Sequence, residues 1–351
     1  MHDFVLEGVA ERAKARGSCD RGEFMPYRNL GRNRSRLRKK LIKEPTIVSQ
    51  PTSVNKVISM REAVESVNDG AHLTFSGFAH SLAPVAVVHE IIRQGKTNID
   101  LSSMGECWAA DLLSGAGALR RTRLSNYMFE GYGRCMNFSR GVQQGEIEVE
   151  DYSHFGITSR FMAGALGVSH LPTKVMSGTD ILNKVTFDKD KFKKLDCPFT
   201  GEPYIAVSAV KPDIAFIHAQ RADLDGNTQI FGMTSIVDEQ ARASKRVIVS
   251  VEEIVDRKEI ARRPELTILP GFLVEAIVEA PFGAHPAGMF RYYNYDDEHI
   301  QHYWKASRDP EAFKAYLDEY VYGTEDHWGY LDKIGGPRKL MALRADPYLG
   351  H

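Results

Sequence analysis

The chain has 351 residues, of which 43% are hydrophobic and 26% are charged, with 45 basic and 46 acidic side chains. The apolar fraction is too high for an intrinsically disordered protein. A net charge of -1 argues against a general nucleic-acid binder. The length allows one large α/β domain or two smaller ones.

The pattern of apolar residues and cysteines indicates a cytoplasmic protein. No run of about 18 apolar residues occurs, so we expect no membrane span. Residues 1–17 carry acidic side chains and no apolar run, so we expect no secretory signal. Because the cysteines stand far apart without a C-x-x-C spacing, we expect neither a zinc site nor a disulfide framework. The four cysteines are Cys19, Cys107, Cys135 and Cys197.

The near-zero total charge hides an uneven distribution along the chain. Residues 1–45 hold 12 basic and 6 acidic side chains, a net charge of +6, and the remaining residues sum to -7. The basic residues are densest between Arg32 and Lys40. We therefore expect residues 1–53 to form a basic N-terminal extension. It can be a solvated tail, as such charge runs usually are, an arm packed on a partner protein, or a nucleic-acid-binding segment.

From Lys56 onward the pattern alternates between strands and helices. Ser59, followed three residues later by Glu62, predicts a capping box that begins a helix ending near Gly70. We expect strands at 72–75, 99–104, 122–127, 173–176, 204–208, 213–218 and 246–251. We expect helices at 84–94, 108–113, 154–166, 235–243 and 310–321. Nearly continuous apolar strands alternating with helices favour an open, mostly parallel α/β sheet flanked by helices.

The first candidate site follows the strand at 72–75. That strand leads into Ser76, Gly77 and Phe78, and a helix begins near Pro84. Open α/β sheets bind ligands at the carboxyl ends of their strands. Gly77 allows close backbone approach, and a helix N-terminus offers unpaired amides to a phosphate or carboxylate. Plain architecture explains such a turn equally well.

Two histidines lie at other strand ends. His218 ends the expected strand at 213–218, where sites are built, although a hydrogen-bonded structural role is commoner for a lone histidine. His285 lies in a Gly-Ala-His-Pro loop that follows Pro281. Its side chain can face a ligand or support the loop.

Glu106 lies between an expected strand and the helix that begins at Trp108. A carboxylate that acts as acid, base or nucleophile would lie at such a place. The alternative is a glutamate at a helix start that complements the helix dipole.

These segments together resemble the A-type half of the family I CoA-transferases, and most closely the glutaconate CoA-transferase branch. The resemblance runs from about Lys56 to Gly336. The family signature has glycine at the position of Ser76. It also has glycine at the position of Leu82, except in the glutaconate branch. The Ser76 hydroxyl can reach the site or merely fill space. The matching segments are Asp69-Gly70 through Gly77-Phe78 to Pro84, Asp151-Tyr-Ser153, Phe-Ile-His218-Ala-Gln220, Ala280-Pro-Phe-Gly-Ala-His-Pro286 and His327-Trp-Gly-Tyr-Leu331.

The resemblance implies a CoA-transferase (NagB/RpiA-like) fold over residues 54–336, including a C-terminal helical tail, followed by a C-terminal segment at 337–351. It also implies covalent catalysis, in which a glutamate attacks an acyl-CoA thioester and then carries CoA itself. In the family that glutamate lies in a Ser-Glu-Asn-Gly or Glu-Ser-Gly context on the B-type half, and neither occurs here. We therefore expect a partner B subunit, in an A2B2 or AB complex, to supply it.

The resemblance implies that CoA is a substrate and not a bound cofactor. It implies no metal, nucleic acid or membrane. The second substrate would be a small mono- or dicarboxylic acid, which the sequence leaves unspecified. Glu106 is kept as a candidate catalytic residue. Ser76, Gly77 and Phe78 are expected to line the shared site, and the residues expected to approach it are Ser102, Ser103 and His218.

Two alternatives remain within the same scaffold. The chain also looks like components of steroid ring-cleaving CoA-ester hydrolases and of glutaconyl-CoA decarboxylases, in which Glu106, or His154 beside Asp151, would be the base. The other alternative is a non-catalytic protein that only binds CoA or supports its partner.

Overall fold

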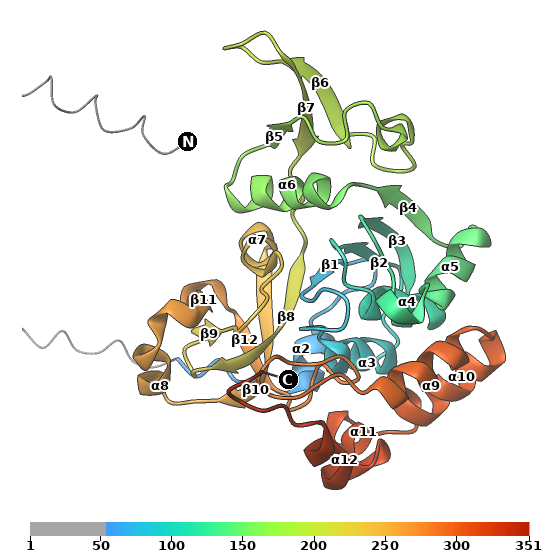
Figure 1. Cartoon of the computed structure of the whole chain (residues 1–351), viewed down its shortest axis with the longest axis vertical. Helices are drawn as coiled ribbons and strands as arrows, with labels where there is room; N and C mark the ends of the chain where they lie inside the picture. The colour runs from blue at the N-terminus through green and yellow to red at the C-terminus, as the bar shows by residue number, and fades with distance from the viewer. Residues whose placement is uncertain (1–53, 351) are drawn as a thin grey trace, which may run out of the picture. The chain divides into compact units, whose positions relative to one another are not determined.

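A central sheet of parallel strands organises residues 54–350, the part of the chain that the computed structural model describes (Figure 1). Its parallel strands follow the order β12-β10-β8-β1-β2-β3-β4. Their bounds are Ala276–Glu279 (β12), Arg246–Ile254 (β10), Ile214–Ala222 (β8), His72–Phe75 (β1), Ile99–Ser102 (β2), Leu119–Leu124 (β3) and Glu148–Asp151 (β4). Two short antiparallel strands extend the sheet beside β8: Thr228–Gln229 (β9) and Thr267–Leu269 (β11). The mostly parallel sheet expected from the sequence is confirmed.

The helices that connect these strands cover both faces of the sheet. From β1 to β4 the chain moves one strand at a time in one direction, and from β8 to β12 it moves in the other. Because such crossovers are right-handed, the two halves place their helices on opposite faces. The direction reverses between β1 and β8, which is the position where open α/β sheets bind ligands. The helices of the first half are Val85–Arg93 (α3), Trp108–Gly115 (α4) and Met136–Gln143 (α5), with Met60–Glu65 (α2) packed on α3, and those of the other face are His154–Ala165 (α6) and Val237–Ala243 (α7).

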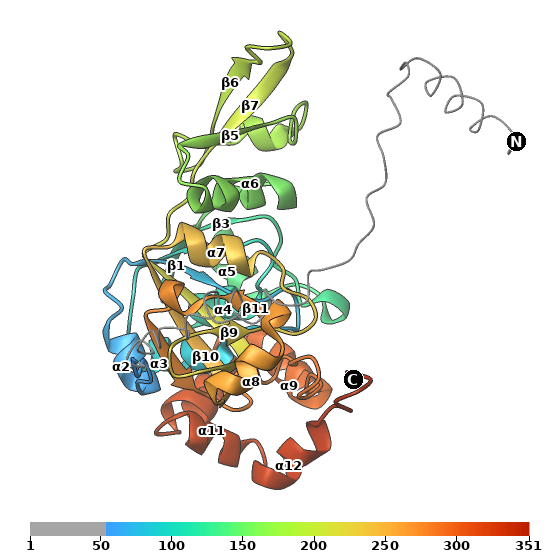
Figure 2. The same ribbon diagram turned by 90° about the vertical axis from the view of Figure 1, so that its left-hand side faces the viewer.

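The C-terminal helices form an outer layer over α3, α4 and α5 (Figures 1 and 2). Aspartates cap three of them, since the carboxylates of Asp296, Asp309 and Asp326 accept hydrogen bonds from first-turn amides. The single helix expected at 310–321 is in fact an α-helix that ends at Leu317 and continues as a π-helical segment. The segments are Asp297–Ser307 (α9), Pro310–Leu317 (α10), Asp318–Tyr322 (η5), His327–Lys333 (α11) and Gly336–Leu343 (α12).

Residues 170–208 form a lobe with a small antiparallel sheet of order β5-β7-β6. Its strands are His170–Thr173 (β5), Phe192–Asp196 (β6) and Pro203–Ser208 (β7). The expected strand at 173–176 is wrong, because Thr173 ends β5 and Met176 has a left-handed φ of 70°. Met176, Ile205 and Val207 of the lobe share a hydrophobic core with Phe161 of α6. The remaining short segments of the chain are Arg257–Arg262 (α8), Glu130–Tyr132 (η1), Asp180–Asn183 (η2), Pro264–Leu266 (η3) and Gly271–Leu273 (η4).

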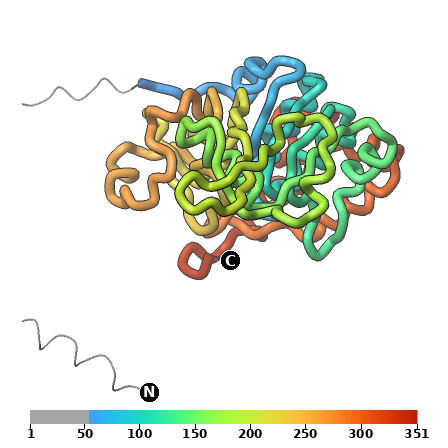
Figure 3. Tube along the Cα trace, turned by 90° about the horizontal axis from the view of Figure 1, so that it is seen from above, coloured from blue at the N-terminus to red at the C-terminus, as the bar shows by residue number. Residues whose placement is uncertain are grey.

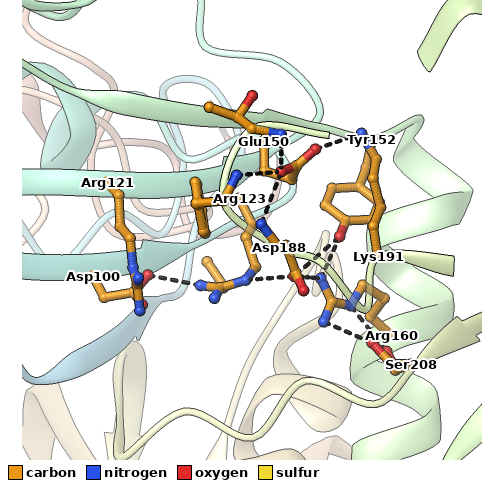
Figure 4. A network of polar contacts seen from close by, with 12 residues as sticks. Asp100, Arg121, Arg123, Glu150, Tyr152, Arg160, Asp188, Lys191 and Ser208 are labelled. Carbon is orange, nitrogen blue, oxygen red and sulfur yellow. Dashed lines mark hydrogen bonds and ion pairs between the residues drawn. The ribbon is translucent and has the colours of Figure 1, made fainter. Parts of the chain in front are cut away.

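A buried ionic network joins the lobe to the main sheet (Figure 4). Lys191 of the lobe and Glu150 of β4 are fully buried, with 2.7 Å between Lys191 Nζ and Glu150 Oε1. Asp188 of the lobe pairs with Arg123 of β3 and Arg160 of α6. Because Glu150, Arg123 and Arg160 come from three separate elements, the network fixes the lobe against the edge strands of the sheet.

The beginning and end of the described chain emerge on opposite sides of this unit (Figure 3). The capping box expected at its first helix is confirmed, because the Ser59 hydroxyl accepts from the Glu62 amide and the Glu62 carboxylate accepts from the Ser59 amide. No helix between residues 54 and 350 has the length and apolar character needed to cross a bilayer. The basic N-terminal extension, residues 1–53, lies outside the described residues.

Candidate functional site

The loop of residues 76–83 leaves β1 at the point where the sheet reverses direction. Phe75 pairs with Phe216 of β8, and the Ser76 amide donates to the Phe216 carbonyl at 2.9 Å. Two residues farther along β8, His218 pairs with Ser250 of β10. The strand register therefore brings Ser76, His218 and Ser250 side by side where β1 ends. The expectation that His218 ends its strand is wrong, because β8 continues to Ala222.

Ser76 joins this loop to β8. Its side chain is fully buried, and its Oγ accepts from the His218 backbone amide and donates to the Leu82 carbonyl, both at 2.8 Å. Leu82 has a left-handed φ of 62°. The hydroxyl thus holds a backbone conformation that side-chain-bearing residues rarely adopt.

Gly77 makes the tight turn possible. Its φ is 117°, and a Cβ added there would lie 3.1 Å from Ala83 Cα, the Ser81 carbonyl oxygen and Glu106 Cγ. Within residues 54–350, the backbone amides of Gly77 and His80 have no hydrogen-bond acceptor. These two N–H groups are therefore free to donate to another acceptor, such as a developing oxyanion.

Phe78 forms a half-buried wall next to this turn. Its ring lies so close to Gly105 that a Cβ there would be 2.7 Å from Phe78 Cε2. The ring also meets the imidazole of His154 edge-on, with centroids 5.9 Å apart. His154 is exposed, and its Nδ1 lies 2.5 Å from Ser125 Oγ. An aromatic surface therefore borders the loop on the side of β3 and β4.

Glu106 lies next to Gly77 of the loop and two residues before the start of α4. The carboxylate is fully buried and accepts hydrogen bonds from the Trp108 amide at 2.7 Å and the Ala109 amide at 2.9 Å. Burial raises the pKa of Glu106 to about 8, against the effect of these two hydrogen bonds. Both side-chain oxygens of Glu106 are thus engaged with amides of the helix start.

Ser102 and Ser103 are buried at the end of β2. Ser102 Oγ lies 2.7 Å from His72 Nε2, and Ser103 Oγ accepts from the Glu106 amide at 3.1 Å. Burial lowers the pKa of His72 to about 4, so its ring is neutral at pH 7. Ser103 therefore belongs to the support of the loop, whereas Ser102 bonds to His72. A contact of either serine with substrate stays a prediction.

His218 belongs to a buried polar cluster that the sequence did not reveal. Its Nε2 lies 2.7 Å from Glu252 Oε1, and its Nδ1 lies 2.9 Å from Ser250 Oγ. Glu252 also accepts from the hydroxyl of Tyr293 at 2.6 Å. Ser250 and Glu252 occupy alternate positions of β10, and that spacing is the signal that could have revealed a polar face. Both ring nitrogens of His218 are occupied within the protein.

His285 faces the C-terminal helices. Its Nδ1 lies 2.7 Å from the Tyr330 hydroxyl, and its Nε2 lies 3.1 Å from Asp296 Oδ2. The ring is buried, and burial lowers its pKa. These contacts favour the role of His285 in supporting its loop over a role in facing a ligand.

Two reactive side chains next to the loop of residues 76–83, those of Glu106 and Cys107, are engaged in hydrogen bonds. The thiol of Cys107 donates to the Ala79 carbonyl at 3.6 Å. Burial raises the pKa of Cys107, so the thiol stays protonated. In the part of the chain that the structure describes, no three His, Cys, Asp or Glu side chains gather in a way that could hold a metal ion. The arrangement suits stabilisation of an oxyanion formed by a nucleophile from elsewhere.

Comparison with known proteins identifies a family for this arrangement. Residues 57–280 match the family model described as coenzyme A transferase. The chain is 38% identical over 283 residues to the A component of 3-oxoadipate CoA-transferase from Pseudomonas knackmussii, covering 80% of this chain and 98% of that protein. It is 35% identical over 324 residues to the A component of glutaconate CoA-transferase from Acidaminococcus fermentans, covering 85% of this chain and 97% of that protein.

A solved structure and a longer relative complete the comparison. The crystal structure of glutaconate coenzyme A-transferase from Acidaminococcus fermentans superposes with a TM-score of 0.81 at 34% identity, covering 84% of this chain and 98% of that one. The chain is also 37% identical over 293 residues to an uncharacterized protein of Archaeoglobus fulgidus, covering 83% of this chain but only 64% of that protein. The resemblance described from the sequence is confirmed, and this chain belongs to the coenzyme A transferase family.

Proposed function

We propose that this chain is the A-type half of a heteromeric acyl-CoA:carboxylate CoA-transferase whose nucleophilic glutamate lies on a B subunit. One observation carries the proposal. The loop of residues 76–83 offers the unpaired amides of Gly77 and His80, while the adjoining carboxylate of Glu106 is fully engaged with α4. A surface that can stabilise an oxyanion but brings no free carboxylate needs a partner that brings one.

The chemistry divides one acyl exchange into covalent steps. The partner's glutamate attacks the thioester carbonyl carbon, the C–S bond breaks, and CoA leaves as the thiolate from an acyl-glutamyl anhydride. The thiolate then attacks the glutamyl carbonyl, which releases the first acid as a carboxylate and leaves CoA on the glutamate. The acceptor carboxylate reverses these steps to leave as the new acyl-CoA. Each attack forms a tetrahedral oxyanion that the amides of Gly77 and His80 can stabilise.

Exposed apolar side chains support a partner at this edge of the sheet. Tyr295 is 51% exposed, and its ring lies 6.0 Å from that of His80 in the loop. Phe290 and Met233 are also exposed, and Phe290 lies against Gly232. Apolar side chains gathered beside a catalytic loop are typical of an interface. The B subunit would cover them and close the site, in an AB or A2B2 complex.

The acid substrate is proposed to be a short dicarboxylate. The names of two relatives specify glutaconate and 3-oxoadipate, which are both acids of this class. CoA enters as a substrate. Cys107, Cys135 and Cys197 are free thiols, which agrees with an enzyme of the reducing cytoplasm.

Co-expression with the B-type gene of the neighbouring open reading frame tests this proposal. The purified complex is offered acetyl-CoA or succinyl-CoA and a panel of carboxylic acids, and the formation of each new acyl-CoA is followed. We expect transfer to dicarboxylates with ping-pong kinetics. Thioester hydrolysis without an acceptor would favour the hydrolase alternative. A neighbouring frame lacking both Glu-Ser-Gly and Ser-Glu-Asn-Gly would contradict the transferase.

A further inference from the structure

Glu252 is the centre of a buried hydrogen-bond network between two loops. We propose that it is a positioning residue, which fixes the loop of residues 76–83 and the loop of residues 281–288 in their working geometry. The proposal rests on the transferase function above, because it assigns these loops to the site. Glu252 itself is 7% exposed on β10, and its carboxylate bonds to His218, Tyr293 and Phe282.

The carboxylate of Glu252 is saturated with donors. Its Oε1 accepts from His218 Nε2 at 2.7 Å and from the Tyr293 hydroxyl at 2.6 Å. Its Oε2 accepts from the backbone amide of Phe282 at 2.7 Å. A buried carboxylate with three donors is rigidly held, and it holds its donors in turn.

One branch of the network reaches the loop of residues 76–83. Glu252 orients the His218 side chain, and the His218 backbone amide donates to Ser76 Oγ. Ser76 Oγ then donates to the carbonyl of Leu82, which has a left-handed backbone. Non-glycine residues persist in this conformation only when the surroundings enforce it. His218 therefore links Glu252, through its ring, to Ser76 and the loop, through its backbone amide.

The other branch reaches the loop of residues 281–288. Phe282, whose amide Glu252 holds, also has a left-handed φ of 55°. The Tyr293 hydroxyl, which donates to Glu252, accepts from the Ala284 amide at 3.1 Å. A Cβ added to Gly283 would lie 2.7 Å from His218 Cε1, so this loop packs directly on the histidine.

The two loops also bond to each other. The Leu82 amide donates to the Gly288 carbonyl at 3.3 Å, and the Gly288 amide donates to the His80 carbonyl at 2.8 Å. A shift of either loop therefore moves the amides of Gly77 and His80. Because oxyanion stabilisation requires donors placed at hydrogen-bond distance, such a shift weakens transition-state binding more than substrate binding.

A matched pair of tyrosine variants tests the proposal in the complex assembled with the B subunit. Tyr293→Phe removes the hydroxyl between Glu252 and Ala284. Tyr303→Phe is the control, since the buried Tyr303 hydroxyl likewise donates to a buried carboxylate, Asp111 Oδ2, at 2.8 Å. We expect Y293F to lower kcat about tenfold with little change in KM for acyl-CoA. We expect Y293F and Y303F to lower the Tm by similar amounts, and we expect Y303F to leave kcat unchanged. Equal kcat in the two variants would overturn the proposal.

A double-mutant cycle and hydrogen exchange complete the test. If Ser76 and Tyr293 act on the same loop geometry, Ser76→Ala combined with Tyr293→Phe lowers kcat by less than the product of the single effects. Independent effects would contradict a shared network. Amide hydrogen exchange gives a readout without catalysis: residues 76–83 and 281–288 exchange faster in Y293F than in Y303F. A wild-type complex without CoA transfer would contradict the proposed function, whereas unchanged exchange in Y293F would contradict the network.

Discussion

The hydroxyl of Ser76 donates a hydrogen bond of 2.8 Å to the carbonyl of Leu82. Leu82 has a φ of 62°, which explains why glycine suits that position. The Ser76 hydroxyl thus holds Leu82 in a backbone conformation that glycine adopts more readily.

Glycine at position 82 is expected to be better tolerated than alanine. Leu82 is buried, so Leu82→Ala costs about 2–5 kcal/mol of unfolding free energy. Leu82→Gly loses the same contacts but removes the left-handed strain of about 1–2 kcal/mol. The free energy of unfolding measured in urea should therefore be at least as high for L82G as for L82A. The control is Leu101 in β2, which is also buried. There the Leu101→Ala variant should have a higher free energy of unfolding than Leu101→Gly. The same order at both positions would contradict the strain.

Glu106 should give the chain a specific pH dependence of stability. The folded-state pKa of about 8 exceeds the ordinary value of 4.5, so between these values the folded chain holds a proton that the unfolded chain has released. The free energy of unfolding of the wild-type chain, relative to that of Glu106→Gln, is therefore greatest below pH 4.5. It falls by about 1.4 kcal/mol per pH unit as the pH rises toward 8. Urea unfolding of both chains at pH 5.5, 6.5 and 7.5 measures this difference. A constant difference would sink the prediction.

Gly77 is expected to be essential for transfer activity. Gly77→Ala introduces a Cβ 3.1 Å from Ala83 Cα, Ser81 O and Glu106 Cγ, so the loop must shift. We expect CoA transfer by the complex to fall about 100-fold. Gly95→Ala is the control, because Gly95 has a φ of 66° but no atom within 4 Å of an added Cβ. That variant should lose about 1 kcal/mol of stability and keep its activity. Full activity in G77A would favour the non-catalytic scaffold alternative.

The lobe should depend on the pair of Lys191 and Glu150. Lys191→Met leaves the buried Glu150 carboxylate without its cation, which should cost about 3–5 kcal/mol of unfolding free energy. Adding Glu150→Gln should recover part of that loss, because the isolated buried charge disappears. Lys174→Met breaks an exposed pair with Glu202 and should cost about 0–1 kcal/mol. Equal losses in K191M and K174M, measured by urea unfolding, would refute the difference.

The basic N-terminal extension is expected to be dispensable for chemistry. It precedes the region of family resemblance, and the family model begins at residue 57. Deleting residues 1–50 should leave CoA transfer by the complex largely intact. Size-exclusion chromatography of the truncated chain with its B-type partner provides the second measurement. Failure to assemble would instead place the extension in the interface between the two chains.

Local signals were sufficient where neighbouring residues decide the structure. The capping box of Ser59 and Glu62 and the turn at Gly77 were both evident in the sequence, since each depends on residues a few positions apart. The strand expected at 173–176 was wrong because β5 is defined by pairing with β7, more than thirty residues away, at His170–Thr173. The lobe was missed for the same reason, since the exposed lysines of β6 carry no strong apolar pattern.

The sequence by itself determined the parallel sheet and the position of the loop at residues 76–83, because apolar periodicity and turn residues act over short distances. The family followed from the resemblance of several separate motifs. Only the tertiary structure decided what Ser76, Glu106 and His218 touch. Ser76 bonds to the His218 amide 142 residues away, and Glu252 lies 34 residues from His218 and 41 from Tyr293. Such contacts depend on the order and register of the strands, and these are set by the pairing of the whole sheet.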